Sequence, residues 1–327
     1  MQAPVQEFLA NIIDYAGLFP PAKLPMEEAF ANYLRYRSGA MSWMLSRFIC
    51  PARRLEEVQV LSRNLPEGAP PLQLSVLLSG GRTPEEWSIN FRADLDAILR
   101  FREAMGEGAS VDFLECRLPD SLSAGPAENL LSFLDAIAVM QKEAGLAGAL
   151  PFFEMAMSAG WDQELPRFIK SIGEFGEKNP GLGSGELAPG FKIRCGGTTP
   201  DAYPSPAQVG AAIFYCRQEG VPLKATAGLH HPVRHQNPGE KVKMHGFLNV
   251  FGAGILARAH EMSLREIVEI VADEHAENFL FTERAFVWHT LRASREELSA
   301  SRKSALISFG SCSFEEPCED LRRMGIL

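Results

Sequence analysis

The chain has 327 residues, of which 46% are hydrophobic and 22% charged, a composition typical of a globular enzyme. A formal net charge of −9 without a compensating basic run argues against a nucleic-acid partner, and no apolar run is long enough for a membrane helix. The first thirty residues do not resemble a secretory signal, so we expect a cytoplasmic protein with no membrane partner. The sequence leaves the oligomeric state open, a homo-oligomer included.

Short apolar runs alternate with helical periodicity along the chain. The runs predict eight strands, at 12–19, 43–50, 72–79, 111–118, 150–157, 190–195, 221–227 and 305–309. Thr83-Pro84 and Ser205-Pro206 mark two helix starts, because each supplies an N-cap and a proline in the first turn. Eight alternating units predict an α/β chain folded as a (β/α)8 TIM-like barrel, with residues 1–327 in one domain.

The segment between the seventh and eighth predicted strands is longer than a plain barrel needs. Residues 246–259 and 263–274 predict two successive helices, an extra helical insertion in the barrel. Residues 232–244 are polar and contain glycine and proline, which is typical of a mobile flap. The glycine-rich dinucleotide and P-loop signatures do not occur at the expected places, and no cofactor is predicted.

Polar side chains interrupt the apolar runs of six predicted strands. Because strand C-termini converge at one mouth of a barrel, we expect these side chains to meet there. They are Asp14, Arg47, Glu115 with Arg117, Glu154, Lys192 with Arg194, and Lys224 with Thr226. A single strand-end charge can also form a structural salt bridge, and Glu115 and Arg117 could simply neutralise each other.

Lys192 and Lys224 lie on consecutive predicted strands, where apolar residues are usual. A buried lysine without a partner would lower the stability of the fold by several kcal/mol, so these lysines are expected to have a functional role. Two ammonium groups close together lower the pKa of lysine and favour the free amine, a nucleophile for carbonyls. We therefore expect Lys192 to attack a carbonyl, Lys224 to lower its pKa, and Glu154 or Glu115 to shuttle protons.

The turn after the eighth strand contains Gly310, Ser311 and Ser313 and runs into a short helix. Backbone amides in such a turn can bind an anion, and barrels often bind phosphate after strands seven and eight. This turn, together with Arg47, Arg117 and Arg194, predicts a binding site for a small anionic metabolite. The alternative is an ordinary helix start with Ser313 as N-cap.

Four histidines follow the seventh predicted strand: His230, His231, His235 and His245. One of the first two is expected to act as acid, base or substrate ligand, together with Asp14 and Thr226 near the substrate. The histidine spacing matches no established metal motif, so no metal is predicted. A metal-dependent lyase or isomerase with Glu115, Glu154 and a histidine as ligands remains an alternative. The six cysteines form no Cys-x-x-Cys pair, and Cys195 beside Arg194 is the candidate for a lowered thiol pKa.

The segments at 192–197 (KIRCGG) and 224–229 (KATAGL) resemble the deoxyribose-phosphate aldolase group of class I aldolases. In that group of barrels a sixth-strand lysine forms the Schiff base and a seventh-strand lysine tunes it, which implies these roles for Lys192 and Lys224. The chain departs from the group at Arg194, where the group has a small hydroxyl residue. The whole chain also resembles a bacterial family that shares KATAGLHH and the ending FGSCS, which implies no activity.

The sequence as a whole predicts a barrel enzyme for a small anionic carbonyl or sugar-phosphate-like substrate. The expected reaction is carbon–carbon lysis through a Schiff base. Besides the metal-dependent alternative, a non-catalytic anion-binding barrel is also compatible with the pattern, since a fold alone does not imply an activity.

Overall fold

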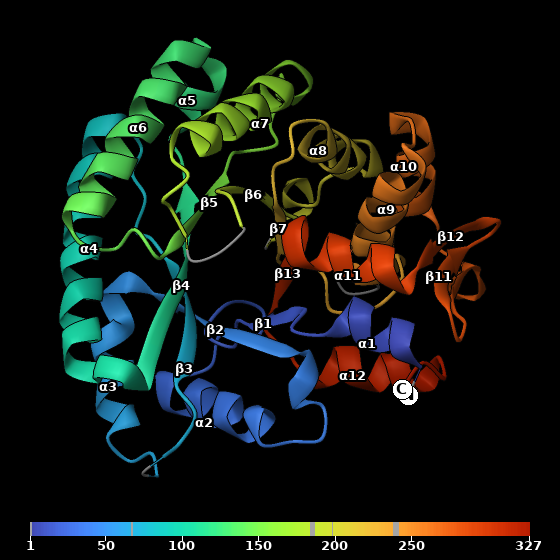
Figure 1. Ribbon diagram of the computed structural model, residues 1–327, viewed down its shortest axis with the longest axis horizontal. Coiled ribbons are helices and arrows are strands. Elements are labelled where there is room, and N and C mark those ends of the chain that lie inside the picture. The colour runs from blue at the N-terminus through green and yellow to red at the C-terminus, as the bar shows by residue number, and fades with distance from the viewer. Residues whose placement is uncertain (1, 67, 184–186, 198, 238–241) are drawn as a thin grey trace.

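The computed structural model describes residues 2–66, 68–183, 187–197, 199–237 and 242–327. Within them, eight parallel strands close into a barrel (Figure 1). In order around the barrel they are β1 (Ile13–Tyr15), β13 (Leu306–Ser311), β7 (Leu223–Thr226), β6 (Gly190–Arg194), β5 (Leu150–Glu154), β4 (Ala109–Arg117), β3 (Leu72–Leu77) and β2 (Leu45–Pro51). Each lies at a predicted strand, so the prediction of a (β/α)8 barrel is confirmed.

Helices surround the barrel strands in Figure 1. They are α1 (Ala3–Leu9), α2 (Met26–Arg37), α3 (Leu55–Ser62), α4 (Pro84–Met105), α5 (Asp120–Ala124), α6 (Ala127–Glu143), α7 (Trp161–Lys178), α8 (Pro206–Gln218), α9 (Phe247–His260), α10 (Leu264–Ala272), α11 (Arg295–Ser304) and α12 (Glu315–Arg323). Short 3-10 turns lie at Ser42–Met44, Ala52–Arg54, Gly106–Gly108, Pro200–Ala202 and Ala276–Asn278. No helix in these described ranges has the length and apolarity needed to span a membrane.

The two predicted helix starts form through the expected side chains. The Thr83 hydroxyl accepts a hydrogen bond from the Glu86 amide at 3.2 Å. Ser205 and Gln208 form a reciprocal capping box at the start of α8. Each cap satisfies amides that a helix start otherwise leaves without a partner, which fixes where the helix begins.

The insertion between β7 and β13 contains the predicted helices α9 and α10, and also strands. The hairpin strands β8 (His235–Asn237) and β9 (Val242–Met244) lie in the predicted flap, whose residues 238–241 are outside the described ranges. An unpredicted antiparallel sheet follows, with β10 (Phe279–Phe281), β11 (Ala285–Trp288) and β12 (Leu291–Ser294). This sheet packs against α1, where the centre of the Phe8 ring lies 5.4 Å from the centre of the Phe281 ring and 5.0 Å from that of Phe286.

A small apolar cluster lies inside the barrel, beneath the polar residues of the strands. Phe113 on β4, Phe152 on β5 and Ile307 on β13 belong to it. Strands β4 and β13 are not neighbours, so these side chains meet across the barrel interior. Phe113 and Phe152 precede Glu115 and Glu154 by two residues, so they fill the layer closer to the strand N-termini.

Candidate active site

Five ionisable side chains form a buried charge cluster inside the barrel, each no more than 2% exposed: Asp14, Glu115, Glu154, Lys192 and Lys224. They come from five strands, β1, β4, β5, β6 and β7. Lys192 and Lys224 are register partners on adjacent parallel strands. Of the six strands predicted to bring charges together at the barrel mouth, five thus place ionisable side chains in one cluster, which is buried inside the barrel.

Lys192 lies between two carboxylates. Its Nζ is 2.9 Å from Oε2 of Glu115 and 2.8 Å from Oε2 of Glu154. Glu154 is the last residue of β5, so this contact faces the C-terminal mouth of the barrel.

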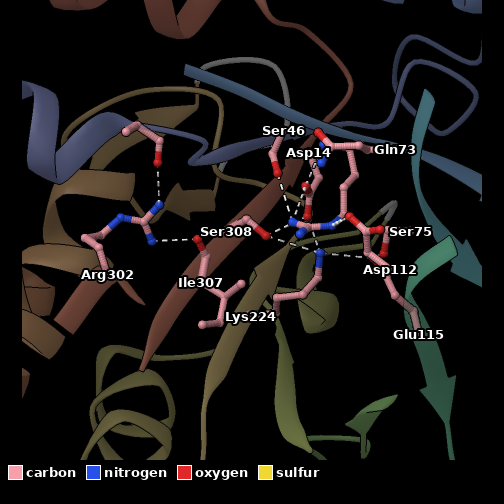
Figure 2. Close-up of polar contacts among 12 residues, drawn as sticks. Asp14, Ser46, Gln73, Ser75, Asp112, Glu115, Lys224, Arg302, Ile307 and Ser308 are labelled. Carbon is pink, nitrogen blue, oxygen red and sulfur yellow. Dashed lines mark hydrogen bonds and ion pairs between the residues drawn. The ribbon is translucent and has the colours of Figure 1, made fainter. Parts of the chain in front are cut away.

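Lys224 is paired with two acids, Asp14 and Glu115 (Figure 2). Its Nζ contacts Oδ2 of Asp14 and lies 3.3 Å from Oε1 of Glu115. The Ser308 hydroxyl donates to Oδ2 of Asp14 at 2.6 Å, and the Ser75 hydroxyl donates to Oε1 of Glu115 at 2.6 Å. Glu115 therefore bridges the two lysines, and serine hydroxyls satisfy part of the remaining acceptor capacity of the acids.

These carboxylates reverse the predicted effect on Lys192. Burial lowers the pKa of Lys192, but Glu115 and Glu154 outweigh burial and raise it above its ordinary value. Burial likewise raises the pKa of Glu115, but the two lysines outweigh it and hold that pKa well below its usual range. The expectation that Lys224 makes Lys192 a free amine is wrong for the resting site, because an acid separates the two ammonium groups.

Acid should destabilise the fold through these carboxyls. Burial raises the pKa of Glu154, but Lys192 and Arg194 outweigh it, so its pKa, like that of Glu115, is lower in the folded chain. Such a group contributes stability above its unfolded pKa of about 4.3, and the contribution is lost as the pH falls toward the folded pKa. We expect the melting temperature to fall progressively below about pH 5. Calorimetry from neutral to acidic pH measures this, and a Glu115→Gln variant should show a shallower decline; an identical decline would contradict the assignment.

Two arginines, here called the mouth arginines, stand at the C-terminal end of the barrel above Glu154. Arg194 ends β6 and Arg117 ends β4, and their side chains are 44% and 50% exposed. Oε1 of Glu154 lies 3.2 Å from Nε of Arg194 and 4.0 Å from Nη1 of Arg117. Arg117 also contacts Asp120 at 3.3 Å. Glu154 thus connects buried Lys192 to two guanidinium groups that reach solvent.

Arg47 does not join the mouth. It is the third residue of β2, and its Nε pairs with Asp112 at 2.9 Å while its guanidinium lies 3.7 Å from the centre of the Phe113 ring. Asp112 precedes Glu115 on β4, so this ion pair lies on the N-terminal side of the charge cluster. The backbone amide of Arg47 donates to Oδ1 of Asp14 at 3.0 Å, so Arg47 helps to position that carboxylate.

Gly310 and Ser311 of the predicted anion turn belong to β13, which ends at Ser311 rather than at Phe309, and hydrogen bonds join the residues of the turn to one another. The Ser313 amide donates to the Ser311 hydroxyl at 3.3 Å, and the Glu316 amide donates to the Ser313 hydroxyl at 3.2 Å. Gly310 is in register with Thr226, and a Cβ at Gly310 would lie 2.9 Å from Oγ1 of Thr226. The hydroxyls therefore occupy two amides that an anion would need. The N-cap of α12 is Phe314 rather than the expected Ser313.

His230 and His231 contact α12 rather than the charge cluster. Nδ1 of His230 lies 3.2 Å from Oε2 of Glu316, and Nδ1 of His231 pairs with Asp320. The His231 ring packs edge-on against His235 at 4.4 Å. Within the described residues, no group of three or more His, Cys, Asp or Glu side chains is arranged to hold a metal ion.

Cys195 is buried, and burial raises the pKa of its thiol to about 12 against a small opposing effect of Arg194. The prediction of a lowered pKa there is wrong, because the Cys195 side chain is fully enclosed while Arg194 extends outward.

Sequence reasoning did not identify the hydroxyl partners of the acids, Ser75 and Ser308. Both are fully buried, and both interrupt apolar strand runs, LQLSVL and LISFGS. A buried hydroxyl in such a run requires a hydrogen-bond partner. That signal was present in the sequence, but it does not name the partner.

Comparison with models of protein families and with curated proteins finds no match. Among solved structures, the chain is similar to one from Toxoplasma gondii ME49 described as a "putative deoxyribose-phosphate aldolase", at 11% identity and a TM-score of 0.36. The match covers 82% of this chain and 72% of the other. A similarity this weak carries no argument about activity. The barrel fold is established by the pairing of the strands of this chain, and the candidate site is described from the contacts of this chain.

Proposed function

We propose that this barrel is a carbon–carbon lyase that acts on a small anionic carbonyl compound through an imine on Lys192. The supporting observation is the line of contacts from solvent inward: Arg194, Glu154, Lys192 and Glu115. It combines an anion-attracting group at the mouth with a buried amine and carboxylates on both sides of it. These are the groups that imine formation needs.

Lys192 is better placed than Lys224 to act as the nucleophile. Glu154, which contacts Lys192, also contacts the exposed Arg194, whereas Lys224 contacts only enclosed groups among those described around it. The Nζ of Lys224 also lies 5.2 Å from the centre of the Phe113 ring, deeper in the barrel. A carbonyl entering from the mouth would therefore meet Lys192 first.

Glu154 is suited to take the proton that Lys192 must lose. An anionic substrate group that binds Arg194 and Arg117 competes with Glu154 for them. Released from these cations, Glu154 becomes a stronger base 2.8 Å from the Lys192 ammonium. The free amine then adds to the carbonyl carbon, and loss of water gives an iminium ion. This ion accepts the electron pair of the carbon–carbon bond that breaks.

The mouth arginines should decide affinity for anions. Arg194→Met is expected to raise KM for an anionic substrate roughly tenfold, since a hydrogen bond to a charged group contributes about 1.5–3 kcal/mol. Steady-state kinetics with an anionic substrate and an uncharged analogue measure the effect, and the analogue should be little affected. Arg265→Met is the control, because this arginine is 90% exposed on α10. An equal rise in KM for both compounds would show that Arg194 does not bind the anionic group of the substrate.

Reductive trapping tests the proposal directly. The protein is incubated with borohydride and each of a panel of small carbonyls, including pyruvate, acetaldehyde and 2-deoxyribose 5-phosphate, and adducts are located by peptide mass mapping. We expect an adduct on Lys192. An adduct on Lys224 instead would exchange the roles of the two lysines, and labelling of neither across the panel would reject the imine mechanism.

A further inference from the structure

A second group of reactive side chains lies between the loop after β7 and the start of α12. The Cys312 sulfur is 3.8 Å from Nε2 and 4.0 Å from Nδ1 of His230. Oε2 of Glu316 lies 3.2 Å from Nδ1 of the same ring, and the Ser311 hydroxyl lies 3.4 Å from it. A thiol, an imidazole and a carboxylate thus meet at one ring, and these are the kinds of group that activate cysteine nucleophiles.

The other cysteines have a different environment. Burial raises the pKa of Cys318 to about 11 and that of Cys195 to about 12, and it raises the pKa of Cys50, Cys116 and Cys216 as well. Within the described residues, no hydrogen bond to a histidine is found for any of these five. Cys312 is therefore distinguished by its partner.

The imidazole is held in its charged form. Burial lowers the pKa of His230, but Cys312 and Glu316 outweigh burial and raise it to about 9. The other titratable groups that face this pair are His231 beside Glu316, His235 beside His230, and Tyr15 on β1 beside Cys312. Glu316 supplies the negative charge in contact with the ring, so an imidazolium is stabilised there at neutral pH.

We propose that Cys312 is a reactive thiol, activated by His230, and a modification site for small hydroperoxides. The thiolate attacks one peroxide oxygen and the O–O bond breaks. The sulfur is oxidised to a sulfenic acid, and the leaving oxygen takes up a proton from the His230 imidazolium, so the hydroperoxide is reduced to water or an alcohol. Cys312 and His230 are each 8% exposed, which admits small reagents rather than protein partners. This inference does not depend on the imine chemistry.

Alkylation by iodoacetamide, followed by mass mapping at several pH values, measures thiolate reactivity. At neutral pH we expect Cys312 to react at least tenfold faster than any other cysteine. His230→Gln should slow the alkylation of Cys312 roughly tenfold at neutral pH, and the difference from the unaltered protein should shrink at alkaline pH. Cys318→Ser, a change of another cysteine close by on α12, should leave the labelling of Cys312 unchanged.

Hydrogen peroxide with a dimedone trap tests the modification itself, and the sulfenic acid adduct should be found on Cys312. Equal alkylation rates for Cys312 and the buried cysteines would overturn the proposal, as would a His230→Gln protein that labels like the unaltered one. If His230→Gln fails to fold, Glu316→Gln replaces it. This variant removes the charge that holds the imidazolium, so it should slow neutral-pH labelling, and an unchanged rate would again overturn the proposal.

Discussion

Glu115→Ala is expected to lower the free energy of unfolding by about 3–5 kcal/mol. Glu115 contacts Nζ of Lys192 at 2.9 Å and of Lys224 at 3.3 Å, and all three side chains are buried. Its removal leaves each buried ammonium short of one carboxylate. Urea unfolding at pH 7 measures the loss.

The surface pair Arg54–Glu57 provides the matched control, because it has a close contact of 2.7 Å but a half-exposed acid. Glu57→Ala should cost no more than about 1 kcal/mol. A loss for Glu115→Ala as small as that for Glu57→Ala would show that the lysines do not depend on this acid.

Lys192→Met should reduce turnover by roughly a thousandfold or more on any carbonyl that forms the trapped imine, since loss of a covalent nucleophile costs at least this much. Methionine keeps the apolar stem, and Glu154 and Glu115 each retain a cation, Arg194 and Lys224, so the fold should survive. Turnover and borohydride trapping should be lost together.

Lys170→Met is the control for this variant, because Lys170 is 63% exposed on α7 and pairs only loosely with Glu174, at 3.9 Å. Lys224→Met should reduce turnover while leaving trapping at Lys192 detectable. A Lys192→Met enzyme with ordinary turnover would exclude the imine, and circular dichroism of each variant separates lost chemistry from lost structure.

The barrel itself could be predicted from the sequence because its signal is local and repeated. Apolar runs of strand length alternate with helices, and caps such as Thr83 and Ser205 mark the helix starts. The sheet of β10, β11 and β12 could not, since its strands have only three or four residues each. Such short runs show no clear alternation, and their stability comes from packing against α1, which lies far away in the sequence.

The convergence of these charged side chains could be predicted from the sequence, but their electrostatics could not. Strand parity and barrel closure place Glu115, Lys192 and Lys224 together. Contacts across the barrel decide whether the ammonium group of Lys192 faces another ammonium group or an acid. That neighbour in turn decides whether the pKa of Lys192 is lowered or raised. The same limit explains Arg47: its strand was predicted, but its height along the barrel axis depends on the strand register.

The shared carboxylate gives the two lysines one common partner. Because Glu115 contacts both Nζ atoms, a change at either lysine alters the surroundings of the other through the same acid. The effects of substitutions at Lys192 and Lys224 are therefore expected not to add, and a double-mutant cycle would measure their coupling.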